Sequence, residues 1–128
     1  MLIDSLQASG VDMSLGVLDN DPSLWGGEVL GVPVLGGDGL LPQLERQGAT
    51  YFVVGLGGIG DNSPRRRLFE LGRKHGMPPL TVCHPNAVCS QWAAVGDGSV
   101  IFAGAVVNAG ATLGVNCIVN TGAIVEHD

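Results

Sequence analysis

The chain has 128 residues, with 21 glycines, 45% hydrophobic residues and a formal net charge of −6 at pH 7. Only six residues are Lys or Arg, so the surface cannot neutralise many phosphates and we expect no nucleic acid partner. No apolar run approaches the roughly 18–20 residues that cross a bilayer, and the N-terminus lacks the basic region of a signal peptide, so the sequence predicts a cytoplasmic protein with no membrane partner.

The first half of the chain alternates short predicted helices and strands. Residues 1–8 have an apolar helical face with no capping residue ahead of it, which suggests missing upstream sequence. Strand composition follows at 13–19, and residues 40–48 are typical of a short helix that ends at a glycine. Residues 51–56, YFVVGL, form an apolar run suited to a buried strand of a parallel sheet. This alternation predicts a small α/β layer.

Residues 55–60 read GLGGIG, which matches the GxGxxG pattern of dinucleotide-binding proteins. An NAD- or FAD-binding oxidoreductase is therefore one hypothesis. It requires a helix that starts at the third glycine and an acidic residue about 20 positions later for the ribose. The sequence disfavours this hypothesis, because the helix is predicted to begin only near Ser63 and residues 71–96 contain no Asp or Glu.

The most regular helical segment is SPRRRLFELGRKHG, residues 63–76. Ser63 is predicted to cap this helix, Leu68 and Leu71 to face inward, and the final glycine to end it. Three consecutive arginines, 65–67, lie in its first turn, where cations oppose the helix dipole. They are either solvated or compensated by a phosphate bound at the helix N-terminus.

A six-residue repeat begins at Val95. An aliphatic residue recurs at every sixth position, and three residues after each of the first five comes Gly or Asn, followed by a small residue. The aliphatic positions are Val95, Ile101, Val107, Leu113, Val119 and Val125. Such a repeat is typical of a parallel β-helix, in which each hexad forms one face of a coil and the aliphatic residue points into the narrow core.

The three cysteines have no CxxC spacing, so they support neither a disulfide framework nor a ribbon-type zinc site. Cys83, His84 and Cys89 could be imagined as metal ligands, but ordinary packing is the simpler interpretation. We therefore predict no metal site, and a structural role for His84 at the entry to the β-helix.

The segment 83–128 resembles bacterial sugar O-acyltransferases and sialic acid O-acetyltransferases, together with the related UDP-amino-sugar N-acetyltransferases. The resemblance is carried by the HPNA entry after Cys83, the hexapeptide coils and the terminal NTGAIVEHD, and it extends to GVLDNDPSLWG and IGDNSPRRRL in the first half. It implies a Rossmann-like N-terminal domain, residues 1–79, that binds a nucleotide sugar, followed by a left-handed β-helix, residues 80–128.

The resemblance also implies a homotrimer that binds acetyl-CoA between subunits. Members of this family have a strand and a GAGGHA-type glycine turn ahead of the helix that corresponds to residues 1–8, and further coils after the HD pair. We therefore expect the chain to be an interior piece of a longer protein, truncated at both ends.

The resemblance places the family's catalytic histidine on His127, which is out of phase with the core positions and should point outward toward a cleft. A neutral imidazole there can accept the proton that a nucleophile loses as it attacks a thioester. Asp128 matches the acidic neighbour that orients this histidine, as an Asp orients imidazole in a serine hydrolase triad.

Two further segments match substrate-binding positions of the family. Asp19 and Asn20 follow a predicted strand, where a nucleotide-binding α/β sheet contacts a ribose or base, although DNDP is equally a turn sequence. The family's sugar-nucleotide loop aligns on Gly60 and runs to Ser63, where the first amides of the helix are free.

The sequence therefore predicts an acetyl-CoA-dependent acetyltransferase that acts on a nucleotide-linked amino sugar or a sialic acid, with His127 as general base. Either a nitrogen or an oxygen atom of the sugar can be the acceptor. The alternative is a non-catalytic module that binds a sugar nucleotide or forms trimers, because a short β-helix can serve as a scaffold only.

Overall fold

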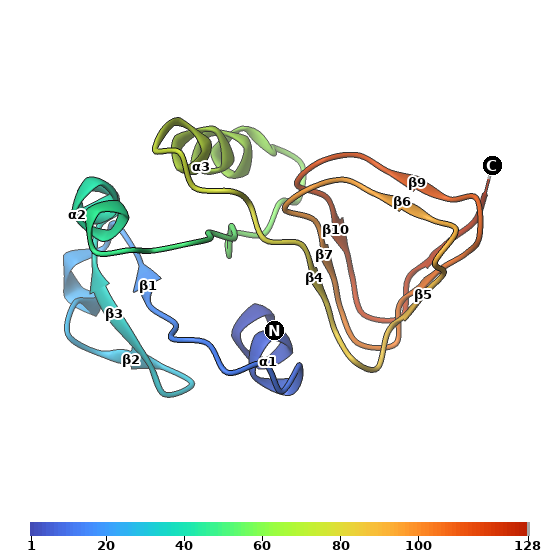
Figure 1. Ribbon diagram of the computed structural model, residues 1–128, viewed down its shortest axis with the longest axis horizontal. Helices are drawn as coiled ribbons and strands as arrows, with labels where there is room; N and C mark the ends of the chain where they lie inside the picture. The colour runs from blue at the N-terminus through green and yellow to red at the C-terminus, as the bar shows by residue number, and fades with distance from the viewer. Residues whose placement is uncertain (128) are drawn as a thin grey trace.

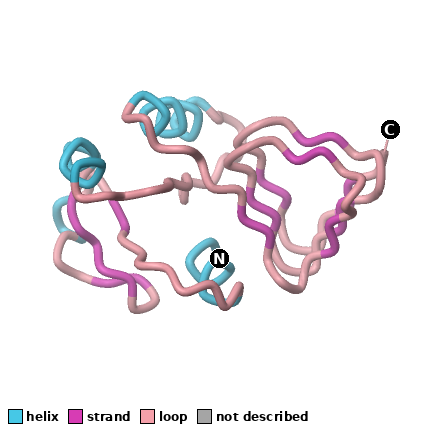
Figure 2. The backbone as a smooth tube through the Cα atoms, viewed as in Figure 1, coloured by secondary structure: helices cyan, strands magenta, loops and turns pink. Residues whose placement is uncertain are grey.

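The computed structural model of the chain describes residues 1–127. A triangular coil of short strands occupies the C-terminal part, and three helices and a small sheet lie to one side of it (Figure 1). The helices are α1 (Leu2–Ala8), α2 (Leu41–Arg46) and α3 (Ser63–Lys74), with 3₁₀ turns at Pro22–Leu24 and Asp38–Leu40. Long loops join these elements, as the tube in Figure 2 shows.

Eight strands of two residues each build the triangular coil. They are β4 (Val82–Cys83), β5 (Val88–Cys89), β6 (Ala94–Val95), β7 (Val100–Ile101), β8 (Val106–Val107), β9 (Thr112–Leu113), β10 (Ile118–Val119) and β11 (Ile124–Val125). Parallel pairing joins β4, β7 and β10 on one face, β5, β8 and β11 on the second, and β6 and β9 on the third. Val100 pairs with both Val82 and Ile118, a step of 18 residues or three hexads per coil. The arrangement is consistent with the predicted left-handed parallel β-helix.

The predicted core positions of the hexads are confirmed. Ile101 and Val107 are fully buried, and the other aliphatic positions join the same apolar cluster. The small residue after each corner also points inward, as shown by Ala105 and Ala111. Ser99 is buried as well, and its hydroxyl donates to the Gly114 carbonyl (2.9 Å). The interior therefore holds one aliphatic and one small side chain per hexad.

The residue before each small side chain takes a left-handed backbone. Gly98, Gly104, Gly110 and Gly122 have φ between +71° and +84°, and Asn116 has φ +56° at the equivalent position. Glycine adopts this conformation without a steric penalty, and asparagine is the residue that best tolerates it otherwise. These positions form the corners at which one face of the β-helix turns into the next.

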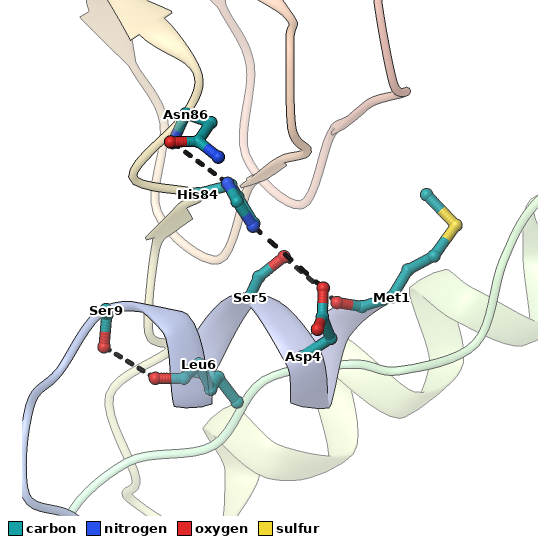
Figure 3. Close-up of polar contacts among 7 residues, drawn as sticks. All are labelled: Met1, Asp4, Ser5, Leu6, Ser9, His84 and Asn86. Atoms are coloured by element: carbon teal, nitrogen blue, oxygen red, sulfur yellow. Dashed lines mark hydrogen bonds and ion pairs between the residues drawn. The ribbon is translucent and has the colours of Figure 1, made fainter. Parts of the chain in front are cut away.

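Helix α1 covers the outer face of β4 and β7. Leu6 of the helix is buried against Val82 and Val100, whose side chains point out of the β-helix. His84 adds a polar contact at the same place (Figure 3): its Nδ1 accepts a hydrogen bond from the Asn86 N–H (3.0 Å). Its Nε2 lies 4.0 Å from Asp4 Oδ2. His84 thus has the structural position that was expected at the entry to the β-helix.

The predicted Rossmann-like domain is wrong for the described residues. The N-terminal sheet has only three short strands in the order β1–β3–β2, where β1 is Val17–Leu18, β2 is Glu28–Val29 and β3 is Val32–Gly36. β1 pairs with β3 in parallel, but β2 pairs with β3 as an antiparallel hairpin. A doubly wound sheet needs a run of parallel strands covered by helices on both faces, and residues 1–127 contain no such sheet beside the β-helix.

The apolar run 51–56, predicted to be a buried strand of a parallel sheet, also differs from the expectation. It joins no sheet and makes only one isolated bridge, between Phe52 and Pro79. The carbonyl oxygens of Val54 and Leu56, which a neighbouring strand would have bonded, accept hydrogen bonds from the Arg65 guanidinium instead. The apolar composition predicted a strand whose backbone bonds to a neighbouring strand. In the structure, the Arg65 side chain donates hydrogen bonds to its carbonyls instead.

Helix α3 has the predicted length but a different buried face. Asn62 is its N-cap residue, and Ser63 is the first helical residue. The buried positions are Arg65, Phe69 and Gly72, whereas the two leucines expected inside are only half-buried. Gly72 is required there because a Cβ would collide with the Phe52 ring.

In the described part of the chain, no helix is long and apolar enough to cross a membrane. The first β-helix strand begins at Val82, and the proposed domain division between residues 79 and 80 stays a prediction.

The burial pattern predicts which isoleucines stabilise the β-helix. We expect Ile101→Ala to lower the free energy of unfolding by about 2–5 kcal/mol, because it opens a cavity in the core. Ile124→Ala at an outward position, 64% exposed, is the matched control and should cost less than about 0.5 kcal/mol. Urea unfolding followed by circular dichroism measures both. Equal losses for the two variants would contradict the assignment of Ile101 to the core.

Candidate functional site

A groove of about 680 Å³ separates α3 from one corner of the β-helix. Its walls come from the loop before α3, from the helix and from the corner around Asn116. The residues that line it include Asn62, Arg65, Phe69, Arg73, Asn116 and Cys117. Phe69 also packs against the neighbouring corner, since a Cβ at Gly98 would collide with its ring.

Arg65 lies at the base of this groove and is only 4% exposed. Its Nη1 donates hydrogen bonds to the carbonyls of Val54 (2.9 Å) and Leu56 (2.7 Å). Its Nε donates to the carbonyl of Asn116 (3.1 Å). Burial lowers the pKa of the Arg65 guanidinium. Arginine remains protonated nevertheless, so a charged side chain joins three segments of the chain.

The other two arginines of this turn are exposed. Arg66 pairs with Glu70 one turn later, with 3.1 Å between Nε and Oε1, and Arg67 faces outward. The two predicted alternatives, solvated arginines or arginines compensated by a phosphate, therefore do not describe all three residues. They did not include the arrangement seen for Arg65, in which backbone carbonyls surround a buried cation.

The predicted sugar-nucleotide loop connects residue 56 to α3. Gly60 has φ +82°, a left-handed conformation that favours glycine. Asp61 accepts a hydrogen bond from the backbone N–H of Ser63 (2.8 Å). A Cβ at Gly58 would displace the exposed Asn62 side chain. The loop is held by its own turn contacts and leaves Gly60 and Ser63 exposed.

Asp19 and Asn20 lie in a turn directly after β1. The Asn20 amide donates to Asp38 Oδ2 (2.6 Å), and the Asn20 Oδ1 accepts from the Asp38 N–H (2.9 Å). The Trp25 indole donates to the Asp19 carbonyl (2.7 Å). The Asp19 carboxylate accepts a hydrogen bond from the Asp21 N–H (2.8 Å), as in a turn, whereas the Asn20 side chain is oriented by Asp38. The Asn20 side chain remains exposed.

His127 follows β11 and is exposed. It lies beside Gly110, where an added Cβ would come within 3.2 Å of the His127 Cβ. Its neighbour Glu126 accepts a hydrogen bond from Asn108 Nδ2 (2.9 Å). Asp128, the predicted partner of His127, lies outside the described residues.

The candidate catalytic and substrate residues lie at different corners of the β-helix. Arg65 and the loop before α3 contact the corner at Asn116, whereas His127 lies at the corner marked by Gly110. The face formed by β6 and β9 lies between these corners along the chain. In Figure 1, the C-terminal end is correspondingly on the side of the β-helix remote from α3. The fold of one chain thus does not bring the two sets together.

No group of three or more His, Cys, Asp or Glu residues in the described part of the chain is arranged to hold a metal ion. The three cysteines are free.

Three solved structures are similar to almost the whole chain. PerB from Caulobacter crescentus, in complex with CoA and GDP-perosamine, is 40% identical with a TM-score of 0.86, over 99% of this chain and 57% of that one. A variant of the perosamine N-acetyltransferase from the same organism, also with CoA and GDP-perosamine, is 40% identical with a TM-score of 0.85 over 97% and 56%. The acetyltransferase domain of PglB from Neisseria gonorrhoeae, in complex with acetyl coenzyme A, is 35% identical with a TM-score of 0.83 over 98% and 58%.

Over nearly its whole length the chain is similar to hexapeptide-repeat sugar acyltransferases. The resemblance that the hexads and the terminal NTGAIVEHD indicated is confirmed. The chain spans between 56% and 58% of the length of the three structures. No protein-family model and no curated protein matched the sequence.

The role of Arg65 was missed in the sequence analysis. Helical spacing would have revealed part of it, because Arg65, Phe69 and Gly72 follow the i, i+4, i+7 pattern of one face. As a charged residue, Arg65 was expected to be either solvated or compensated by a phosphate at the helix N-terminus. An arginine whose spacing matches that of buried residues is the available signal, and its carbonyl partners lie up to 51 positions away.

The turn at Asp61 has a pH dependence that can be measured. Hydrogen bonding by the Ser63 side chain, and then by its backbone N–H, lowers the pKa of Asp61 from its ordinary value of 3.8. A carboxylate with a lowered folded-state pKa stabilises the fold above the unfolded-state pKa, and this contribution is lost as the pH falls through the lower folded value.

We therefore expect native protein to be more stable than Asp61→Asn at neutral pH, and the difference to shrink as the pH falls below 3.8. Urea unfolding at several pH values measures the difference, and NMR titration of the carboxyl measures the pKa directly. An Asp61 pKa at or above 3.8 in the folded protein would contradict the proposed turn contact.

Proposed function

We propose that the protein containing this chain is an acetyl-CoA-dependent N-acetyltransferase that acts on a nucleotide-linked amino sugar. The observation that carries this proposal is the 40% identity to PerB, a structure in complex with CoA and GDP-perosamine, over 99% of this chain. The PglB acetyltransferase domain in complex with acetyl coenzyme A supports the same donor. Among the acceptors that the sequence left open, these similarities favour the amino group of a sugar over a hydroxyl.

The proposed role of His127 is general base. Acetyl-CoA supplies the acetyl group as a thioester. The amine nitrogen of the sugar forms a bond to the thioester carbonyl carbon, the carbon–sulfur bond breaks, and the proton lost by nitrogen passes to His127 and then to the departing sulfur. Asp128 would orient the imidazole. Structures of the perosamine N-acetyltransferase include variants in which one histidine is replaced by asparagine or alanine, and we propose that His127 is the corresponding residue.

For the nucleotide sugar we propose the loop from Gly60 to Ser63, together with Asp19 and Asn20. The loop exposes its backbone beside the N-terminus of α3, where the helix dipole favours an anion such as a phosphate. Asn20 is exposed after β1 and is held in one orientation by Asp38. A fixed amide of this kind is suited to recognise a polar edge of a ribose or base.

We further propose a homotrimer in which each active site is shared by two subunits. Two observations support this proposal. First, His127 and the loop belong to different corners of the β-helix within one chain. Second, the β-helix exposes large apolar side chains at Val88 (63%) and Trp92 (75%), which a second copy could cover.

The catalytic role is tested by His127→Ala in the whole protein. We expect kcat for acetyl transfer to fall by about 10²- to 10⁴-fold, because the attacking amine loses its proton acceptor. His75→Ala, at the end of α3, is the matched control and should leave kcat unchanged. Thioester cleavage, followed through the released CoA thiol, measures both. Near-normal turnover by His127→Ala would remove the general-base assignment.

A shared site predicts complementation between two inactive variants. Gly60→Val strains the left-handed loop position, whose surroundings have room for a side chain, and His127→Ala removes the proposed base. Each variant alone should be inactive. Trimers assembled from equal amounts of both should recover about a quarter of native activity. At each head-to-tail interface, the chance that the loop is intact is one half, and so is the chance that the neighbouring histidine is intact. If co-assembled trimers show no recovery, the site is not shared in this way.

A further inference from the structure

Arg65 connects the segment before the glycine-rich loop to a corner of the β-helix. The proposed reaction needs these two parts at a constant distance. The Arg65 Nη1 bonds to the carbonyls of Val54 and Leu56, immediately before the glycine-rich loop. Its Nε bonds to the carbonyl of Asn116 at a corner of the β-helix. In an extended segment, carbonyls two residues apart point the same way, so one nitrogen can bond both.

The segment before the loop depends on these bonds. Residues 53–56 belong to no strand, and the bridge between Phe52 and Pro79 fixes only the start of the run. Arg65 therefore supplies the donors that a sheet neighbour would otherwise provide. The loop from Gly57 to Asn62 is short and glycine-rich, so its position follows from the position of its two ends, at Leu56 and at α3.

The β-helix side of the contact is rigid. Asn116 occupies a corner with φ +56°, and its N–H donates to the Asp97 carbonyl of the coil below (2.9 Å). From this corner the chain runs through β10 and β11, both paired in the ladder, to His127. A loop attached to this corner keeps a constant position relative to the β-helix of its own chain, and hence to the histidine of a symmetry-related copy.

We infer that Arg65 is a positioning residue, which holds the nucleotide-sugar loop on the β-helix and so sets the affinity for the acceptor substrate. This inference rests on the proposed function. It assigns Arg65 no contact with the substrate or with the reacting atoms. Its effect is on the acceptor and not on acetyl-CoA, because the loop carries the proposed acceptor contacts.

The kinetic test uses Arg65→Met in the whole protein. The matched control is Arg67→Met, at an exposed position two residues later in the same helix. We expect KM for the nucleotide amino sugar to rise by about ten- to a hundred-fold in Arg65→Met, since a small displacement of a binding element has effects of this size. KM for acetyl-CoA should stay unchanged, and Arg67→Met should behave like native protein. Arg65→Lys keeps one charged donor and should recover part of the affinity.

A second measurement does not depend on acetyl transfer. Amide hydrogen exchange across residues 54–62 should be faster in Arg65→Met and in the milder Arg65→Lys than in native protein and Arg67→Met. Unchanged exchange in both Arg65 variants, or equal changes in the two KM values, would overturn the inference. If native protein acetylates no nucleotide amino sugar, the proposed function fails, while the exchange measurement still shows whether Arg65 holds the loop.

Discussion

The narrow interior of the β-helix is the constraint on which the rest of the structure depends. Each hexad places one aliphatic side chain and one small side chain inside, and then turns the backbone through a left-handed corner. A larger side chain at a small position would have no space, because Ala105 and Ala111 are already fully buried. The regular stack that results gives flat outer faces, and α1 and α3 pack against these faces and their corners.

The contact between α3 and the β-helix combines an apolar and a polar part. Phe69 packs tightly at the Gly98 corner, and Arg65 bonds to the Asn116 corner one coil later. Burying a guanidinium is costly unless its donors are bonded, and each hydrogen bond from a charged group offsets about 1.5–3 kcal/mol. Three carbonyls accept hydrogen bonds from Nε and Nη1 of Arg65, whereas the buried Nη2 has no hydrogen-bond partner among the described residues. Because the partners are backbone atoms, the contact fixes the position of two chain segments rather than that of side chains alone.

This geometry explains how a regular scaffold can carry a reactive site at its edge. A β-helix has no deep cavity of its own, since side chains fill its interior. Reactive groups therefore lie at corners and on outer faces, where elements outside the coil can complete a cleft. His127 lies at one corner and the loop before α3 is tied to another, so the proposed site, if it uses both, requires contributions from more than one subunit. The value of a rigid scaffold is that these contributions keep constant distances.

The sequence by itself determined the β-helix, its core positions and its corners, because each hexad meets the same local requirement and the repeat displays it six times. It also located α3, since Pro64 and Gly76 act within one turn of the helix ends. It could not determine what the backbone of the segment YFVVGL, residues 51–56, bonds to. An apolar run indicates burial, but whether its backbone bonds to a strand or to Arg65 depends on residues brought together from elsewhere in the chain. The tertiary structure alone decided that the arginine turns inward, because its partners, Val54, Leu56 and Asn116, come together only when α3 packs against the β-helix.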